Sequence, residues 1–136
     1  KEVGKKNKPI HLKRGMSATL KEWLNAAEYI MAEGNNNVVL CERGIRTFEN
    51  YTRNTLDLNS VAIIKEKYRL PVIVDPSHGT GIRSIVPIMS MAAIAAGADG
   101  IMIESHINPE ESISDSDETV SLETVGNIVD NIKKGR

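Results

Sequence analysis

Four short apolar runs in this sequence each end in a side chain that can bind an anion or a metal ion. Lys13 follows the first run, Arg43 the second, His78 the third, and the fourth ends at Glu104. If the runs are parallel β-strands, these residues meet at the carboxyl edge of one sheet, where ligands bind in parallel α/β folds. The recurrence of such side chains at equivalent places predicts a functional site.

The residue types predict two kinds of chemistry. Lys13 and Arg43 suit a small phosphorylated carboxylate, because a guanidinium fork matches phosphate oxygens and an ammonium group matches a point anion. His78, Glu104 and an aspartate from the last polar loop form a mixed nitrogen and oxygen set that is typical of Mn, Fe, Co or Zn. Such a divalent metal can polarise an aldehyde oxygen. The sequence has no glycine-rich phosphate loop of the Rossmann or Walker type.

Each of these residues also has a purely structural interpretation. Lys13 could be a solvated surface charge, Arg43 could pair with Glu42, and Glu104 could be an ordinary charge at a strand end. His78 could be a hydrogen-bonded loop histidine. Cys41 is predicted to lie in the core, because a free cysteine behaves as a small apolar residue.

Two further groups are harder to assign. His11 lies within the first apolar run and is interpreted as packed or solvated. Asp115 and Asp117 stand in an acidic segment with Glu110, Glu111 and Glu118, and a solvated loop is the structural alternative for that segment.

The elements that would position these residues alternate along the chain. The predicted strands are residues 9–13, 38–41, 71–74 and 100–103, and the predicted helices are residues 19–33, 60–68, 82–96 and 122–133. Four such pairs predict a parallel α/β sheet with right-handed crossovers. A doubly wound open sheet and part of a (β/α)8 barrel both fit. A complete barrel needs about 200 residues or more, so this chain would supply half of one.

Composition limits the function classes. The 136 residues suit one domain, and 17 basic against 18 acidic residues give a net charge of −1. This balance argues against general binding to nucleic acid or to an anionic membrane. The single cysteine excludes an intrachain disulfide and indicates a reducing, cytoplasmic location.

Four motifs carry a resemblance to a known family. They are KPIHLKRGM from residue 8, CERGIRTFENYTRNTLDL at 41–58, PVIVDPSHGTG at 71–81 and GADGIMIESHINPEESISD at 97–115. They resemble, in order, strands five to eight of the barrel of 3-deoxy-7-phosphoheptulonate (DAHP) synthases. The resemblance covers essentially all of residues 1–136 and implies the C-terminal half of a (β/α)8 barrel.

The resemblance implies a role for each site residue. Lys13 matches a lysine that contacts the carboxylate of phosphoenolpyruvate, and Arg43 matches the arginine that holds its phosphate. Arg14, beside Lys13, is counted with the substrate-binding residues. His78 matches a metal ligand that also lies against the substrate, so Lys13 and His78 are the expected catalytic residues. The other implied ligands, Glu104 and Asp115, follow in the chain, with Asp117 as a competitor for the last role.

The implied reaction is the metal-assisted condensation of phosphoenolpyruvate with erythrose 4-phosphate, the entry step to aromatic amino-acid synthesis. The family also has a cysteine ligand in a Gly-Pro-Cys segment and a Lys-Pro-Arg-Thr-Ser segment that binds both substrates. Neither segment occurs in this sequence, and Cys41 lies on a different strand from that ligand. We therefore expect the isolated chain to lack synthase activity.

Three other functions stay open at this point. One is a related enzyme that makes 3-deoxy-octulosonate 8-phosphate, and another is a metal-free aldolase with Lys13 as a Schiff-base nucleophile. The third is a half-barrel module without catalysis. A half-barrel exposes two sheet edges and an apolar inner face, which predicts a homo-oligomer closed around a two-fold axis. Reordering of the strands into an open sheet with helices on both faces is the alternative.

Overall fold

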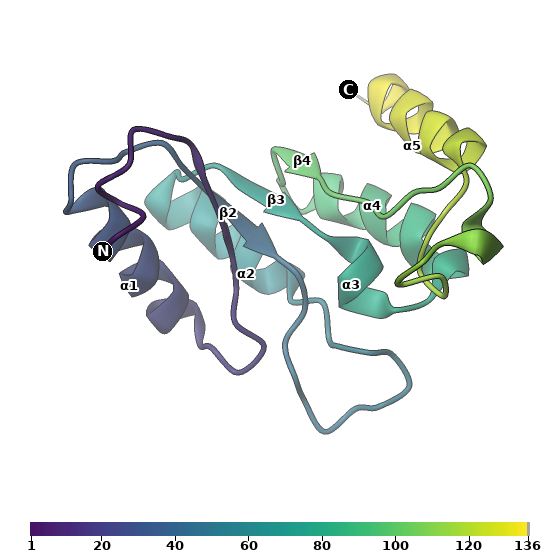
Figure 1. The fold of residues 1–136 in the computed structure, drawn as a ribbon, viewed down its shortest axis with the longest axis horizontal. Coiled ribbons are helices and arrows are strands. Elements are labelled where there is room, and N and C mark those ends of the chain that lie inside the picture. The colour runs from purple at the N-terminus through teal and green to yellow at the C-terminus, as the bar shows by residue number, and fades with distance from the viewer. Residues whose placement is uncertain (136) are drawn as a thin grey trace.

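A computed structural model describes residues 1–135 and contains one parallel sheet of four strands. The strands are β1 (Ile10–Lys13), β2 (Val38–Glu42), β3 (Val72–Val74) and β4 (Gly100–Ile101), and they lie in the order β1-β2-β3-β4 (Figure 1). All three pairings are parallel. Each strand thus lies beside the next one in the chain, as in a barrel wall.

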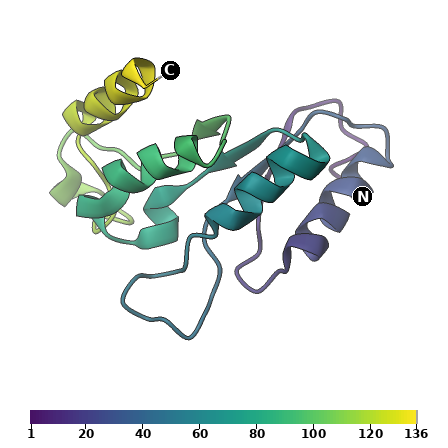
Figure 2. The ribbon, with the colours of Figure 1, turned by 180° about the vertical axis from the view of Figure 1, so that it is seen from behind.

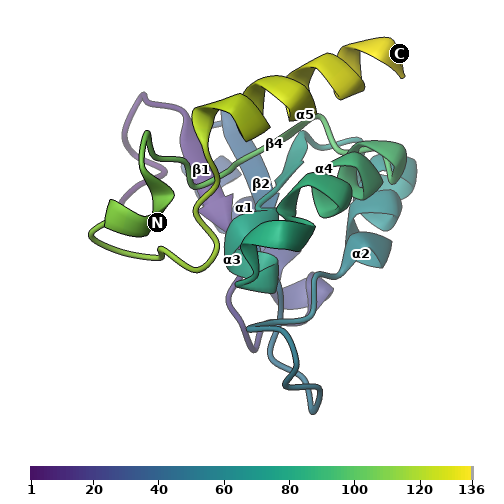
Figure 3. The same cartoon turned by 90° about the vertical axis from the view of Figure 1, so that its right-hand side faces the viewer.

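Helices connect the strands. They are α1 (Leu20–Met31), α2 (Leu58–Ile63), the π-helical turn η1 (Ile64–Tyr68), α3 (Pro76–Thr80), the 3-10 turn η2 (Arg83–Ile85), α4 (Val86–Ala95), the 3-10 turn η3 (Pro109–Glu111) and α5 (Leu122–Lys134). In the view from behind, α1, α2 and α4 lie in front of the sheet (Figure 2). The last helix, α5, packs beside α4 (Figure 3). Among the described helices, none is both long and apolar enough to cross a membrane.

Local sequence explains where α1 begins and how it docks. Thr19 caps the helix by accepting from the backbone N–H of Glu22, whose side chain accepts from the Thr19 backbone N–H in return. The indole of Trp23 then donates to the Leu12 carbonyl at 3.2 Å, which fastens the helix to β1. Ala27, one turn further along, is buried on the same face.

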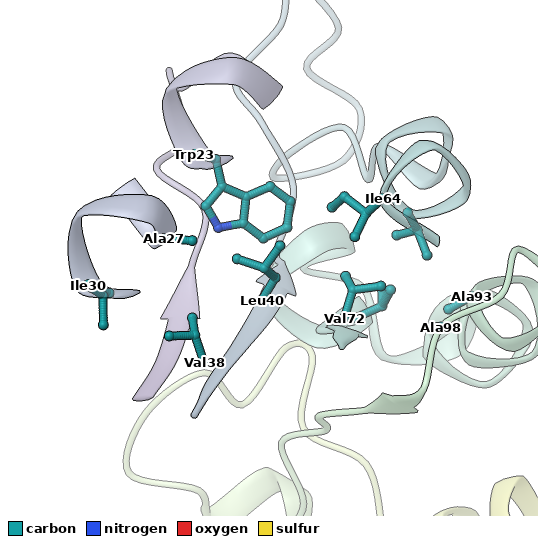
Figure 4. Packing of buried hydrophobic residues seen from close by; sticks show 11 residues of the cluster. Trp23, Ala27, Ile30, Val38, Leu40, Ile64, Val72, Ala93 and Ala98 are labelled. Carbon is teal, nitrogen blue, oxygen red and sulfur yellow. The ribbon is translucent and has the colours of Figure 1, made fainter. Parts of the chain in front are cut away.

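The hydrophobic core lies between the helices and the outer face of the sheet. Trp23 and Leu40 pack together from α1 and β2, and Ile64 and Val72 continue the cluster toward Ala93 of α4 (Figure 4). This placement accounts for the mostly apolar strands that the sequence shows.

The inner face of the sheet, unlike the outer face, is not covered by helices within residues 1–135 (Figure 1). His11 and Lys13 on β1 are exposed, and Val39 and Ile73 are only partly buried. Of the helices in residues 1–135, none lies over this face, which is turned toward the viewer in Figure 1, and the strands follow chain order. The prediction of half a (β/α)8 barrel is confirmed, and the doubly wound or reordered sheet with helices on both faces is not what the chain forms.

The predicted boundaries need one correction around β3. The sequence predicts a loop after β3 and a helix over residues 82–96, whereas the structure has α3 and η2 in this region, with α4 beginning at Val86. The cause is local: Asp75 caps α3, and Pro76 occupies its first turn. This short helix proves important because it carries His78.

A buried ion network joins β1, β2 and α2. The guanidinium of Arg14, 4% exposed, donates to Glu42 Oε2 at 2.8 Å and to Asp57 Oδ2 at 2.9 Å. Glu42 is fully buried and also accepts from the Gly44 backbone N–H at 2.7 Å. Burial raises the pKa of Glu42, while its hydrogen bond from Arg14 opposes that rise. The network fixes the ends of two neighbouring strands, from which Lys13 and Arg43 project.

We predict that Arg14→Met lowers the free energy of unfolding by about 3–5 kcal/mol, because it leaves Glu42 as a buried charge without its partner. The double variant Arg14→Met/Glu42→Met should recover much of that loss. Lys5→Ala removes an exposed ion pair with Glu2 and should cost less than about 1 kcal/mol. Urea unfolding measures all three, and equal stability of Arg14→Met and the wild type would contradict a supporting role for the network.

Candidate functional site

The carboxylate of Asp75 is the centre of the site. Its Oδ2 accepts from Lys13 Nζ at 2.8 Å and from His78 Nδ1 at 2.7 Å. Asp75 is fully buried, whereas 38% of the Lys13 side chain and 18% of the His78 side chain are exposed. One oxygen therefore holds two of the predicted site residues side by side at the carboxyl edge of the sheet.

The short helix α3 explains how His78 reaches Asp75. The other carboxylate oxygen, Asp75 Oδ1, accepts from the backbone N–H of His78 at 3.0 Å and so caps the helix. Because a carboxylate only accepts, the His78 Nδ1 atom carries the proton of this bond. In a neutral imidazole that leaves Nε2 as a free lone pair, which is the form a metal ligand needs.

The free nitrogen of His78 faces carboxylates from the segment after β4. His78 Nε2 lies 3.7 Å from Glu104 Oε1 and 3.8 Å from Asp115 Oδ2. His78, Asp115 and Glu118 each offer a ligand atom, and these atoms lie within 4.8 Å of one another. Two ligands of one ion at roughly 2.0–2.2 Å each are separated by about 3–4 Å. The donor types and their spacing fit a divalent metal ion.

An arginine from the long loop after β2 holds the acidic segment in place. Arg53 Nη1 donates to Asp115 Oδ1 at 3.2 Å and also pairs with Glu118. The hydrogen bond from Arg53 lowers the pKa of Asp115, while burial raises the pKa of Glu118. Arg53 also donates its backbone N–H to the Thr80 carbonyl at 3.0 Å, which ties the loop to the end of α3. Three chain segments therefore meet around His78.

Arg43 supplies a second cation at the end of β2. Its side chain is partly buried, and within residues 1–135 its buried Nη1 has no hydrogen-bond partner. A buried donor without an acceptor is costly and uncommon. The structural alternative, a pair between Arg43 and Glu42, is not formed, since Glu42 is bonded to Arg14 and Gly44. Arg43 thus has a donor free for an anion.

Arg14 does not join this group. The family resemblance predicts it among the substrate-binding residues, but its guanidinium is buried against Glu42, Asp57 and Ser60. Adjacent residues on an extended strand point to opposite faces, so Arg14 lies away from Lys13. The structure places Arg14 in the network that supports the site, and its role in substrate binding stays a prediction.

Three other candidates are also placed outside the ligand set. Cys41 is fully buried, as predicted, and burial raises the pKa of its thiol to about 12, so it carries no thiolate at neutral pH. Asp117 has an exposed side chain and, within residues 1–135, forms no ion pair with His78, whereas Glu104 and Asp115 both approach His78 Nε2. His11 lies on the inner face and is largely exposed. Partial desolvation of its ring and the nearby Lys13 charge lower its pKa.

Sequence reasoning missed Asp75, Arg53 and Glu118 as parts of the site. Asp75 had a readable signal, because Asp followed by Pro is typical of a helix cap, and a cap bonds the backbone two or three residues later. Arg53 and Glu118 had none, since their pairing joins loops that are 65 residues apart in the chain.

Comparison with known proteins identifies relatives of the whole described chain. The profile described as the DAHP synthetase I family matches residues 1–135. A phospho-2-dehydro-3-deoxyheptonate aldolase from Thermotoga maritima is 49% identical over 133 residues, which are 98% of this chain and 39% of that protein. A 2-dehydro-3-deoxyphosphooctonate aldolase from Geobacter sulfurreducens is 30% identical over an alignment of 143 positions, which covers 97% of this chain and 52% of that protein.

Solved structures of similar fold include one of a protein with the same name as the Thermotoga maritima sequence relative. The crystal structure of a Thermotoga maritima phospho-2-dehydro-3-deoxyheptonate aldolase superposes with a TM-score of 0.95 at 49% identity, covering 98% of this chain and 39% of that one. A truncated form of 3-deoxy-D-arabino-heptulosonate 7-phosphate synthase from Thermotoga maritima gives 0.93 at 50% identity, covering 96% and 50%. The chain thus spans about two-fifths to one-half of the length of these relatives.

The geometry predicts that His78→Ala weakens binding of Mn2+ or Zn2+ by more than about 100-fold. Loss of a residue that only hydrogen-bonds to a metal ligand typically weakens binding by about 10–100-fold, and loss of a ligand itself should weaken it further. His106→Ala is the matched control, because His106 is exposed and its ring bonds only to the backbone of Asn108 in the same loop. Titration calorimetry on metal-free protein measures both. Equal affinity of His78→Ala and the wild type would remove His78 from the metal site.

Asp75→Asn should weaken metal binding by about 10–100-fold while the ligands themselves are unchanged. An asparagine turns an N–H donor toward His78 Nδ1 and thereby favours the tautomer with the proton on Nε2, which cannot bind a metal. The same titration applies, with circular dichroism to verify the fold. Wild-type affinity in a folded Asp75→Asn protein would show that Asp75 does not control His78.

Proposed function

The chain belongs to the DAHP synthetase I family, and from this we propose that it supplies the phosphoenolpyruvate-binding and metal-binding half of a DAHP synthase barrel. The activity of the whole protein would be the condensation of phosphoenolpyruvate with erythrose 4-phosphate. The observation that carries the proposal is the shared bond of Asp75 to Lys13 and His78, which joins an anion-binding residue to a metal-binding one.

Two cations support binding of phosphoenolpyruvate. Lys13 Nζ is partly exposed at the sheet edge and keeps donors beyond the one that Asp75 accepts, which suits the carboxylate of the substrate. Arg43 has a buried donor without an acceptor, which suits the phosphate. Phosphoenolpyruvate carries both groups on one small molecule, so these two residues together favour it over a simple phosphate.

His78, Glu104 and Asp115 are the proposed metal ligands. A divalent metal bound there would supply Lewis-acid polarisation of the aldehyde oxygen of the second substrate. The bond to Asp75 favours the neutral tautomer of His78 with the proton on Nδ1 and the lone pair on Nε2, and Arg53 orients Asp115. The donor set favours Mn, Fe, Co or Zn over Mg or Ca because it includes an imidazole.

The comparisons favour the heptulosonate product over the octulosonate one. The relative named for the deoxyheptonate reaction is 49% identical, against 30% for the Geobacter sulfurreducens protein named for the deoxyphosphooctonate reaction. The Schiff-base alternative gains no support, because that chemistry needs a free amine and Lys13 Nζ is held in an ion pair with Asp75.

Partners of the chain follow from its exposed faces. The inner face and the outer edges of β1 and β4 have no covering element within the described residues. We propose that other strands close the barrel, from the rest of a longer protein or from a second copy in a homo-oligomer. The single buried thiol supports a reducing, cytoplasmic location.

Phosphoenolpyruvate binding tests this proposal. Arg43→Ala and Lys13→Ala should each weaken binding by roughly 1.5–3 kcal/mol, the usual value of a hydrogen bond to a charged group. Arg43→Lys should recover only part of the loss, because the fork is absent.

Lys67→Ala changes an exposed lysine of η1, away from the carboxyl edge, and serves as the control. Calorimetry at fixed ionic strength gives the affinities. If Arg43→Ala and Lys67→Ala bind phosphoenolpyruvate equally well, Arg43 does not contact the substrate.

A further inference from the structure

Asn54 is a buried amide that lies next to the site. It stands on the returning arm of the long loop between β2 and α2, which projects beyond the ends of β2 and α3 (Figure 1), yet it is only 5% exposed. Its Nδ2 donates to the backbone carbonyl of His78 at 3.0 Å. Because a carbonyl only accepts, the amide must turn its N–H toward it. This buried side chain is therefore bonded to the main chain of the proposed metal ligand His78.

The His78 carbonyl needs such a donor because α3 is short. The helix ends at Thr80, and the last carbonyls of a helix have no partner within it. The backbone N–H of Ile82, four residues after His78, donates instead to the Thr80 hydroxyl at 3.3 Å. Asn54 thus supplies the hydrogen bond that a longer helix would supply through its own backbone.

The backbone of His78 is consequently held on both sides of its Cα atom. On one side its N–H donates to Asp75 Oδ1 at 3.0 Å, and on the other its carbonyl accepts from Asn54. The ring bond to Asp75 then has only the side-chain torsions left to set. Without the bond from Asn54, the peptide after His78 would be free to turn, and the direction of Nε2 would change with it.

Close packing keeps Asn54 in this position. Gly44, at a φ of +88°, lies so near that a Cβ atom added there would be 2.6 Å from the Asn54 Cβ atom. The space for Asn54 therefore depends on a glycine at position 44. The two arms of the loop are also joined, since the backbone groups of Ile45 and Thr55 bond to each other in both directions at 2.9 Å. Asn54 thus has little freedom to leave the His78 carbonyl.

We propose that Asn54 is a positioning residue, which fixes the peptide after His78 and so sets the direction of the Nε2 lone pair. This inference rests on the proposed function, in which His78 is a metal ligand. Asp75 selects the tautomer that can bind a metal, and Asn54 determines where that tautomer points. Because Asn54 belongs to the long loop, a displacement of the loop is passed on to His78.

Asn54→Leu tests the proposal, because leucine has nearly the same shape as asparagine but no donor. Calorimetry on the purified chain should show Zn2+ binding weakened by about 10–100-fold, the usual effect of losing a group that orients a metal ligand. Asn35→Leu is the matched control, since Asn35 is 6% exposed and donates to the carbonyls of Lys6 and Lys8 at 2.7 and 2.8 Å, far from His78 at the amino edge of the sheet. It should lower stability but keep the Zn2+ affinity of the wild type. The proposal is overturned if the two folded variants lose affinity equally, or if Asn54→Leu loses none.

NMR of the metal-free chain separates positioning of His78 from general loss of stability. The ring 15N signals of His78 should change in Asn54→Leu and keep their wild-type values in Asn35→Leu, and an unchanged ring in Asn54→Leu overturns the proposal. If Asn54→Leu does not fold, the wild type still decides: a scalar coupling across the hydrogen bond should join Asn54 Nδ2 to the His78 carbonyl carbon, and its absence overturns the proposal. If the ring signals change as expected but the wild type binds no Zn2+ at His78, positioning by Asn54 stands and the metal site of the proposed function fails.

Discussion

Asp75 Oδ2 accepts hydrogen bonds from Lys13 on one side and His78 on the other. Removing this carboxylate would leave the lysine and the imidazole at the same strand ends but without a common anchor. The bond to Lys13 neutralises part of a buried negative charge, and the bond to His78 fixes the tautomer. The anion-binding and metal-binding parts of the site are thereby held in one geometry, and each depends on the same buried group.

A second buried network supports this arrangement from the opposite face. Alternation along β1 sends Lys13 to the inner face and Arg14 to the outer one, where Arg14 meets Glu42. Arg43, the residue after Glu42, keeps a donor free as a result. In each of the consecutive pairs Lys13-Arg14 and Glu42-Arg43, the two side chains point to opposite faces of the sheet. Lys13 and Arg43 face the candidate site, and Arg14 and Glu42 form the supporting ion pair.

Much of the fold and several residues of the candidate site could be predicted from the sequence. The spacing of apolar residues predicts the strands and helices. Charged and imidazole side chains at the predicted strand ends single out Lys13, Arg43, His78 and Glu104. Sequence alone could not separate Lys13 from Arg14, because strand phase at a strand end is ambiguous by one residue. It also could not find Arg53 and Glu118, since their contact depends on how two distant loops pack. Asp75 was within reach, as its Asp-Pro pair marks a helix cap.

The hydrogen bond from His78 Nδ1 to Asp75 determines the tautomer of His78, and the NMR signals of the two imidazole nitrogens report that tautomer directly. Long-range 1H–15N NMR of the metal-free wild-type protein distinguishes the two tautomers at about pH 8.5, where an ordinary imidazole is neutral. The His106 ring, bonded within its own loop, and the exposed His11 ring provide internal references. We expect His78 to carry its proton on Nδ1, with Nε2 unprotonated. A proton on Nε2, with Nδ1 free, would contradict it.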